Sequence, residues 1–235
     1  MNLKGTEITW LGHATFRFRT SDGKVVLVDP WVMGNPACPE DEKSPSQIDL
    51  MLITHAHFDH IGDAVELGTK LSPNTWAIYE TATWLGGKGV PNVDGLNKGG
   101  TVTDDATGVR FTMTHAVHSC GIVDDGQIIY GGEAAGYVIE FPGGLRVYHS
   151  GDTTVFSDMK IIGELYEPDV CLLPIGDLYT MSPREAGYAC KLLGAKAVIP
   201  MHFGTFPALT GTPEQLRKEA PDTEIIELKP GAPLS

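Results

Sequence analysis

The sequence concentrates side chains that bind metals in one short segment. Directly after the apolar run Leu50 to Ile53, and within six residues of one another, stand His55, His57, Asp59 and His60. Three imidazoles and a carboxylate this close together are costly to desolvate and repel one another when protonated, unless a cation organises them. Imidazole and carboxylate are ligands of zinc, manganese and iron. The segment therefore predicts a metal site.

An irregular turn here could serve two metals, because the first two histidines can face one ion while Asp59 and His60 face its neighbour.

Two later apolar runs end in the same kind of chemistry. The run Arg146 to Tyr148 is followed by His149 and Asp152, and the run Ala197 to Met201 by His202. Metal-binding side chains that repeatedly follow predicted strands suggest that the ends of these strands lie together at one edge of the fold, which we call the rim. These residues would complete a ligand set for two metals.

Further candidate ligands follow another apolar run, where two histidines stand close together. His115 comes directly after Phe111 to Thr114, and His118 stands three residues later. Their spacing from the run allows either to reach the rim.

The rest of the chain supplies the elements that must position these residues. Short apolar or alternating runs predict strands at Ile8 to Trp10, Val25 to Val28, Leu50 to Ile53, Trp76 to Tyr79, Val109 to Thr114, Tyr137 to Phe141, Leu145 to Tyr148, Val170 to Leu173 and Ala197 to Ile199. The strands before Tyr148 look mainly hairpin-like, whereas the later ones alternate with helices, which indicates mixed sheets in an α/β architecture.

Helix-start signals stand between some of these strands. Ser182-Pro183-Arg184-Glu185 combines an N-cap, a first-turn proline and a capping-box glutamate, and predicts a helix that runs to about Leu193 and stops at Gly194. Thr212-Pro213-Glu214-Gln215 shows the same combination of residues and predicts a short C-terminal helix. The segment from Ile61 to about Leu71 suits a third helix.

Length and charge limit the classes of partner. The chain has 235 residues and a formal net charge of -13. One domain over residues 1–235 is expected at this length. The charge disfavours nucleic acid and anionic lipid, although divalent cations could reverse the field inside one cleft. We therefore expect a small-molecule substrate, which could be anionic, and no nucleic-acid or membrane partner.

Four cysteines stand far apart, with no pair in a metal-binding or redox spacing: Cys38, Cys120, Cys171 and Cys190. Reduced, mostly structural thiols are expected. The N-terminus has no apolar leader and no run approaches transmembrane length, so we expect a soluble cytoplasmic protein. A homo-oligomer is compatible with the sequence, which does not specify one.

The pattern formed by His55, His57, Asp59 and His60 resembles the H-x-H-x-D-H hallmark of the metallo-β-lactamase superfamily. Further segments carry the resemblance nearly end to end: Trp10-Leu11-Gly12-His13, Val28-Asp29-Pro30, Ser150-Gly151-Asp152-Thr153, Leu173-Pro174-Ile175-Gly176-Asp177 and Pro200-Met201-His202-Phe203-Gly204-Thr205-Phe206. They look like a compact branch of metal-dependent hydrolases that is similar to L-ascorbate-6-phosphate lactonase. The resemblance implies a four-layer αββα sandwich with two mixed sheets and the metals at one edge of the sheets.

The resemblance also implies a ligand set for two metal ions. The set is His55, His57 and His118 on the first ion, Asp59, His60 and His202 on the second, and Asp152 as a bridge between them. His118 is favoured over His115 because the branch has its ligand immediately before a small polar residue, here Ser119.

A site of this kind predicts hydrolysis. Two divalent ions, zinc by first expectation with manganese, nickel or iron as alternatives, would lower the pKa of bound water towards neutrality. The resulting metal-bound hydroxide would attack an ester, lactone or phosphoester of a small molecule. Asp59 is the candidate proton shuttle to the leaving group. Substrate specificity is expected in the loops Trp31 to Ser46 and Trp84 to Gly100.

Other function classes are disfavoured by specific features. Diiron oxidoreductases of the same fold usually carry a carboxylate where His57 stands, and are followed by a flavin-binding domain for which this chain has no room. A nuclease or other phosphodiesterase acting on nucleic acid would be expected to bring an inserted domain or a basic arm. A structural zinc site prefers cysteine-rich shells, and no cysteine lies in the implied ligand set.

Several polar residues near the motifs are expected to support the ligands rather than to bind metal. His13, Asp29 and His149 could hydrogen-bond to metal-bound imidazoles, and a role as satisfied core or turn residues is equally compatible. Asp177 could orient a ligand, contact substrate or cap a loop.

Overall fold

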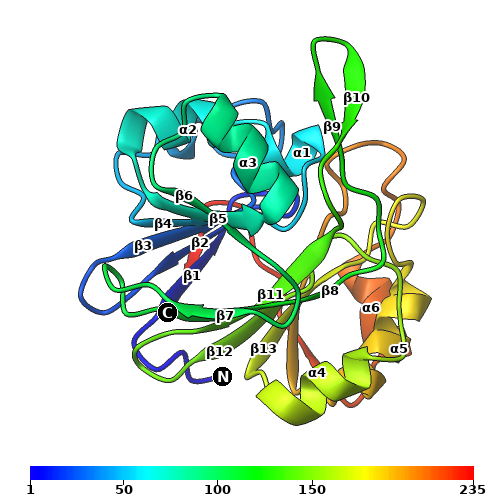
Figure 1. Cartoon of the computed structure of the whole chain (residues 1–235). Helices are drawn as coiled ribbons and strands as arrows, with labels where there is room; N and C mark the ends of the chain where they lie inside the picture. Colours follow the sequence, from blue (N-terminus) through cyan, green and yellow to red (C-terminus); the bar gives the residue numbers. More distant parts are fainter.

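The computed structural model describes residues 1–235 as two β-sheets that face each other, each with helices on its outer side (Figure 1). The strands of the first sheet are β1 (Glu7–Trp10), β2 (Phe16–Arg19), β3 (Val25–Val28), β4 (Leu50–Leu52), β5 (Asn74–Ile78), β6 (Val93–Leu96) and β16 (Pro233–Leu234). Its order is β16-β1-β2-β3-β4-β5-β6. Helices α1 (Phe58–Ile61), α2 (Ala64–Leu71) and α3 (Tyr79–Gly87) lie on its outer side.

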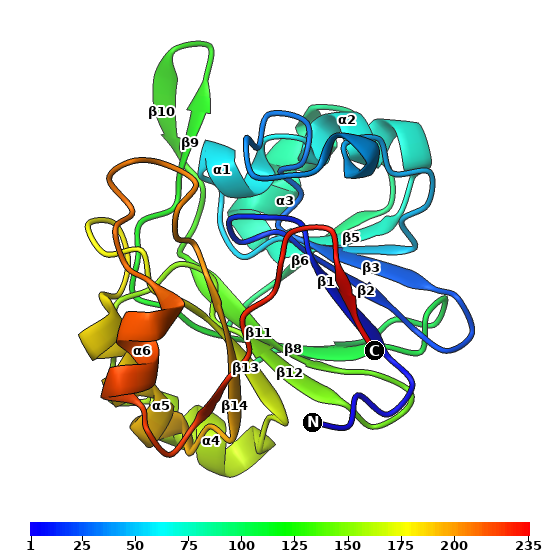
Figure 2. The same ribbon diagram turned by 180° about the vertical axis from the view of Figure 1, so that it is seen from behind.

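The second sheet comes from the later part of the chain. Its strands are β7 (Thr101–Thr103), β8 (Arg110–His115), β11 (Ala135–Glu140), β12 (Arg146–His149), β13 (Val170–Pro174), β14 (Ala197–Met201) and β15 (Glu224–Ile225). Helices α4 (Met159–Tyr166), α5 (Pro183–Leu193) and α6 (Pro213–Glu219) cover it. Figure 2 shows the C-terminal segment returning to the first sheet, where β16 pairs with β1. The four-layer αββα sandwich expected from the sequence is confirmed.

A hairpin of two strands, β9 (Gly121–Asp124) and β10 (Gln127–Tyr130), projects from the body of the molecule (Figure 1). It belongs to neither large sheet. A two-stranded hairpin is marginally stable alone, so side-chain contacts must hold it in place. Trp84 Nε1 of α3 and Nζ of Lys88, the residue directly after that helix, donate hydrogen bonds of 2.8 and 2.7 Å to the carboxylate of Asp124.

The core joins the two sheets. A cluster of 44 buried hydrophobic residues draws on both sheets, and a second cluster of 16 lies between the second sheet and helices α4 to α6. Phe18 of the first sheet meets Phe141, which follows β11, with ring centroids 5.1 Å apart. Each such fully buried ring contributes about 1.5–3 kcal/mol through the hydrophobic effect, so the sheets are held together by their inner faces.

The helix signals at both capping boxes are confirmed. The Ser182 side chain accepts from the Glu185 N–H, and the Glu185 carboxylate accepts from the Ser182 N–H, at the start of α5. Gly194 ends that helix in the left-handed conformation, with φ of 59°. Thr212 and Gln215 form the same reciprocal pair at the start of α6.

The expectation of mainly hairpin-like pairing before Tyr148 is wrong for one part of the chain. Strands β1 to β3 are antiparallel, as are β7, β8, β11 and β12, but β3, β4, β5 and β6 pair in parallel. Parallel neighbours need crossover connections. Helices α2 and α3 supply two of them, and α3 was missed because it starts directly at the end of β5 and contains Thr81 and Thr83, which favour strands.

The helix expected from Ile61 to about Leu71 is confirmed as α2, which starts at Ala64, and a break at Gly62 and Asp63 separates it from the short helix α1, which ends at Ile61. The Asp63 carboxylate accepts the backbone N–H groups of Val32 and Met33 at 2.6 and 2.8 Å. This contact ties the break to the loop after β3. Asp59 and His60 consequently lie in a single helical turn, not in an irregular turn as expected.

The four cysteines are unpaired and buried, in agreement with structural thiols. Burial raises the pKa of Cys38 to about 12 and that of Cys190 to about 11, which keeps both thiols protonated and unreactive. The longest helix, α5, has 11 residues, and none of the helices is long and apolar enough to span a membrane.

Candidate metal centre

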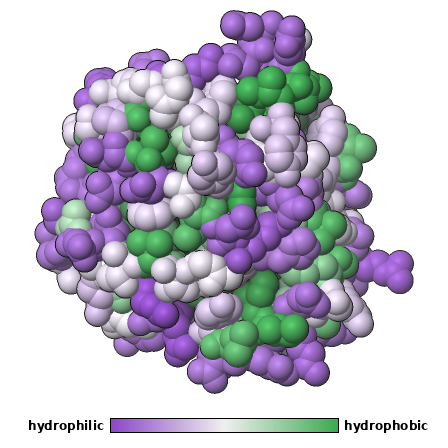
Figure 3. Space-filling view, in the orientation of Figure 1, coloured by the Kyte–Doolittle hydropathy of each residue, from purple (hydrophilic) through white to green (hydrophobic).

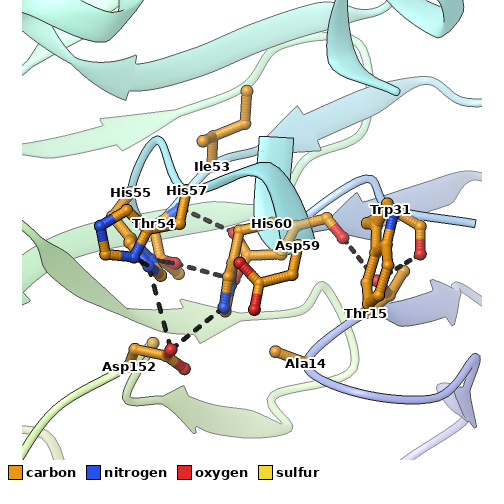
Figure 4. Close-up of polar contacts among 12 residues, drawn as sticks. Ala14, Thr15, Trp31, Ile53, Thr54, His55, His57, Asp59, His60 and Asp152 are labelled. Atoms are coloured by element: carbon orange, nitrogen blue, oxygen red, sulfur yellow. Dashed lines mark hydrogen bonds and ion pairs between the residues drawn. The ribbon is translucent and has the colours of Figure 1, made fainter. Parts of the chain in front are cut away.

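The turn after β4 carries the first part of the centre. His55 and His57 precede α1, and Asp59 and His60 lie within it. His55 and His60 are fully buried, whereas Asp59 keeps partial access to solvent. Figure 4 shows these side chains gathered on one side of the turn, with Asp152 facing them from the other sheet.

The second sheet delivers the remaining residues from three strand ends. His118 follows β8, Asp152 follows β12 and His202 follows β14 directly. Gly151 is needed for the turn before Asp152, because its φ is 60° and a Cβ there would lie 2.4 Å from the Ala135 carbonyl oxygen. The shared rim predicted from the strand ends is present. We call the assembled residues the cluster: His55, His57, Asp59, His60, His118, Asp152 and His202.

Three imidazoles of the cluster converge on one point. His55 Nε2 lies 3.0 Å and His118 Nε2 3.3 Å from His57 Nδ1. The three nitrogens form one of the groups whose geometry could hold a metal ion. His115, the alternative to His118, is instead exposed and lies 3.1 Å from Lys98 Nζ, away from this group.

Asp152 lies between these imidazoles and the rest of the cluster. Its Oδ2 is 3.0 Å from His202 Nε2 and 3.3 Å from His60 Nε2. The same oxygen is 3.7 Å from His118 Nε2 and 3.9 Å from His55 Nε2. Asp59 Oδ2 is 3.8 Å from His202 Nε2 on the other side. One buried carboxylate oxygen therefore faces histidines of both parts.

Asp29, at the end of β3, holds the turn from behind. Its Oδ1 accepts the Thr54 N–H at 2.8 Å, and its Oδ2 accepts the Thr54 hydroxyl and His60 Nδ1, both at 2.7 Å. Because the Thr54 hydroxyl donates to Asp29, it is free to accept from His55 Nδ1 at 3.1 Å. These bonds turn the Nε2 atoms of His55 and His60 towards the cluster, which is the supporting role expected for Asp29.

His13 contacts the cluster through Asp59. Its Nε2 lies 2.9 Å from Asp59 Oδ2, and its Nδ1 lies 3.0 Å from the Thr205 hydroxyl. Burial lowers the pKa of His13 to about 4, against the opposing effect of the Asp59 hydrogen bond. The imidazole is therefore neutral near pH 7, donating to Asp59 and accepting from Thr205. The expected supporting role of His13 fits this contact, although its Nε2 also lies within the second possible metal group, with Asp59, His60 and His202.

The carboxylates Asp59 and Asp152 of the cluster favour positive charge on the histidines around them. Burial favours the neutral form of Asp152, but His202 and His60 outweigh it and hold the pKa of Asp152 well below its usual range. In the same way, burial opposes the charge of His202, but Asp152 and Asp59 raise the pKa of His202 to about 9. The pKa of His60 also rises, because Asp152 and Asp29 outweigh burial. The surroundings of Asp152 therefore favour bound positive charge.

Three residues at the centre adopt left-handed backbone conformations that side chains rarely take. The φ angles are 56° at His13, 53° at Asp29 and 54° at His202. The His202 N–H donates to the His13 carbonyl oxygen at 2.9 Å, so two of these strained residues support each other. Backbone strain of this kind is typical of functional sites.

Two further expected residues have local roles. His149 is buried, with Nε2 3.0 Å from the Ala14 carbonyl oxygen and Nδ1 accepting the Gly151 N–H at 3.1 Å, so it is a satisfied core histidine. Asp177 accepts the Leu178 N–H at 2.8 Å and shapes its own loop.

A cavity of about 700 Å³ opens over the cluster and reaches His57, Asp59, His118, Asp152 and His202. None of its lining residues comes from Trp31 to Ser46 or Trp84 to Gly100, the loops in which specificity is expected, although the Trp31 ring packs behind the wall residues Phe58 and Phe206. The walls come instead from α1, the β9–β10 hairpin and the loops after β13 and β14. The sequence gives no signal for this, because single apolar loop residues follow no spacing rule.

Comparisons with known proteins agree with the fold and the site. A family model described as the beta-lactamase superfamily domain matches residues 24–203. A UPF0173 metal-dependent hydrolase of Koribacter versatilis is 58% identical over 231 residues, covering 98% of both chains. Another, from Methanopyrus kandleri, is 46% identical and covers 95% of this chain and 97% of its own. The solved structure of Igni18, a metallo hydrolase from Ignicoccus hospitalis, is 36% identical, with a TM-score of 0.85 and 97% of both chains covered. The chain therefore belongs to the metallo-β-lactamase superfamily, as a metal-dependent hydrolase.

Proposed function

We propose that the protein uses two divalent metal ions to hydrolyse an ester, lactone or phosphoester of a small molecule. The proposed ligands are His55, His57 and His118 for one ion, Asp59, His60 and His202 for the other, and Asp152 for both. The observation that carries the proposal is the position of Asp152 Oδ2, which lies 3.0, 3.3, 3.7 and 3.9 Å from the Nε2 atoms of four histidines.

Buried polar atoms without hydrogen bonds support this assignment. His60 Nε2, both ring nitrogens of His202 and Asp152 Oδ1 are buried and have no hydrogen-bond partner. Leaving such an atom unsatisfied costs about 1–3 kcal/mol, and more for a charged group. Cations bound at these atoms would remove that cost. A set of imidazoles and carboxylates suits zinc first, and manganese, nickel or iron also accept these ligands.

Divalent ions bound here would supply Lewis acidity and activate water for attack on a carbonyl or phosphorus centre. The chain's own residues provide the position and the proton path. Asp59 lies at the cavity, where the hydrogen bond from His13 and the nearby imidazole of His202 outweigh burial and keep the pKa of Asp59 well below its usual range. An ionised carboxylate in this place can accept a proton from the attacking water and pass it to the leaving group. His13 holds that carboxylate in place and is a positioning residue.

The proposed activity is tested with metal-loaded protein and three probe classes: 4-nitrophenyl esters, simple lactones and bis(4-nitrophenyl) phosphate. We expect hydrolysis of at least one class, loss of that activity on chelation with the circular dichroism spectrum retained, and recovery on adding zinc or manganese. The variant Asp59→Asn should lower kcat by about 10²- to 10⁴-fold, as for the loss of a proton-transfer group.

Metal content must be measured in the same Asp59→Asn sample, because Asp59 is also a proposed ligand. Full kcat in this variant would remove the proton-shuttle role. Activity that survives complete removal of metal would contradict the proposed mechanism as a whole.

The choice of His118 over His115 predicts different metal contents for two alanine variants. His118→Ala should lose about one of two ions per chain, because its imidazole lies 3.3 Å from His57 Nδ1. His115→Ala, a matched change at an exposed histidine three positions earlier, should keep both. Elemental analysis of protein purified without chelator measures this. Equal losses in the two variants, or loss only in His115→Ala, would reverse the assignment.

Asp29→Asn should weaken metal binding although it replaces none of the proposed ligands. The asparagine side chain has only one acceptor oxygen, so it cannot accept all the hydrogen bonds that Asp29 accepts from Thr54 and His60. At least one of these residues loses its orientation, and metal affinity should therefore fall about 10- to 100-fold. Competition with a chromogenic chelator gives the affinity. Asp49→Asn is the control, since Asp49 accepts the Val25 N–H at 2.8 Å at the opposite end of β3. Wild-type affinity in Asp29→Asn would show that Asp29 does not position the centre.

A further inference from the structure

The walls of the cavity over the cluster are apolar. Beyond the residues of the cluster, the side chains that line it are mainly Phe58, Val123, Tyr179, Phe206, Pro207 and Ala208. They come from four separate segments: α1, strand β9, the loop after β13 and the loop after β14. Four segments that each place an apolar side chain around one opening indicate a binding surface for an apolar group.

Aromatic packing fixes one wall. The rings of Phe58 and Phe206 have centroids 6.4 Å apart, and the Trp31 ring packs against both, at 5.8 and 5.9 Å. Phe58 is nevertheless 63% exposed. An exposed aromatic ring held in place from behind has already lost its conformational freedom, so covering it with a ligand costs little further entropy.

The β9–β10 hairpin extends the apolar surface outward. Val123 lines the cavity and is 68% exposed, and Ile128 and Tyr130 on the partner strand are 80% and 71% exposed. Figure 3 shows hydrophobic surface just below the polar tip of this projection. The bonds from α3 and the residue directly after it to Asp124 hold the hairpin beside the opening.

Tyr179 is held at the opening by a strained loop. The two residues before it, Asp177 and Leu178, have φ angles of 67° and 52°, which are unfavourable for side chains. Leu178 and Tyr179 are 64% and 61% exposed. Backbone strain of this kind is common at ligand-binding sites, so this loop is a candidate wall of such a site.

The cavity contains no cationic side chain that would pair with an anion away from the cluster. No lysine or arginine lines it, its charged side chains all belong to the cluster, and the other polar side chains that line it are the neutral hydroxyls of Ser119 and Tyr179. A phosphate or carboxylate on the part of a substrate that lies away from the cluster would lose its hydration without gaining a cationic partner or bidentate N–H hydrogen bonds. An anionic substrate would therefore have to place its charge at the cluster itself.

We propose that the part of the substrate next to the scissile bond is an uncharged apolar group, an alkyl or aryl substituent seated between Phe206, Val123 and Tyr179. The substrate class is thus an apolar ester or lactone rather than one with a distal phosphate or carboxylate. This inference rests on the proposed hydrolase function and narrows its substrate.

The test is a chain-length series with a charged counterpart. Metal-loaded protein is given the 4-nitrophenyl esters of acetate, butyrate, hexanoate and octanoate, and the rate of every ester in the test is corrected for its own spontaneous hydrolysis without protein. We expect kcat/KM to rise about two- to fourfold per added CH₂ until the cavity is filled. Mono-4-nitrophenyl succinate, which resembles the butyrate ester but ends in a carboxylate, should be at least about tenfold poorer than butyrate. A flat series, or a preference for the succinate ester, overturns the inference and leaves the hydrolase proposal intact.

Variants locate the effect in the cavity. Phe206→Ala should flatten the chain-length dependence, whereas Tyr188→Ala, which removes an exposed aromatic ring on α5 outside this cavity, should not. Val123→Lys places a cation at an exposed wall position, and should improve the succinate ester relative to butyrate by roughly tenfold. Chain-length dependence unchanged in Phe206→Ala would place the apolar contact elsewhere and overturn the proposal.

A binding measurement separates this inference from the hydrolase proposal. Butanehydroxamate, octanehydroxamate and succinate monohydroxamate are titrated into metal-loaded protein by calorimetry. Tighter binding of the octyl compound and weak binding of the succinate compound support the apolar site even if no ester or lactone is hydrolysed, in which case only the hydrolase proposal fails. Affinities independent of chain length overturn the inference, whatever the turnover.

Discussion

The buried carboxylate of Asp29 constrains the whole centre. It has no exposure to solvent, yet it accepts three hydrogen bonds, two from Thr54 and one from His60. An unpaired charge in this place would be strongly destabilising, so the turn after β4 must present donors to it. Those donors set which nitrogen of His60 and His55 faces the cluster. The left-handed backbone at Asp29 is the conformational cost of aiming its carboxylate there.

The two sheets are the reason that the cluster exists at all. The turn after β4 belongs to the first sheet, whereas His118, Asp152 and His202 follow strands of the second. Neither sheet alone contains both parts, so the cluster forms only when the inner faces pack around the core of 44 residues. Bonds between loops refine the arrangement: the Thr153 hydroxyl accepts the Val117 N–H at 3.0 Å, which ties the loop of His118 to that of Asp152.

The sequence predicted what depends on local patterns. The dense His and Asp segment, the strand ends at Asp152 and His202, and both capping boxes follow short-range rules, and the structure brings these residues together or forms these helices. The choice between His118 and His115 needed a family resemblance, because spacing from one strand cannot say which side chain turns inward. Parallel pairing of β3 to β6 and the break at Asp63 depend on long-range contacts, which periodicity does not encode. The apolar walls of the cavity come from four segments that lie far apart in the sequence, so no single stretch of sequence predicts them.

We propose that the cluster holds two metal ions with Asp152 between them. The most direct measurement is an anomalous difference map from a crystal grown with zinc and without chelator, with data collected on both sides of the zinc absorption edge. Two peaks per chain are expected, one against His55, His57 and His118 and the other against Asp59, His60 and His202. A single peak, or peaks away from the cluster, would contradict the proposal.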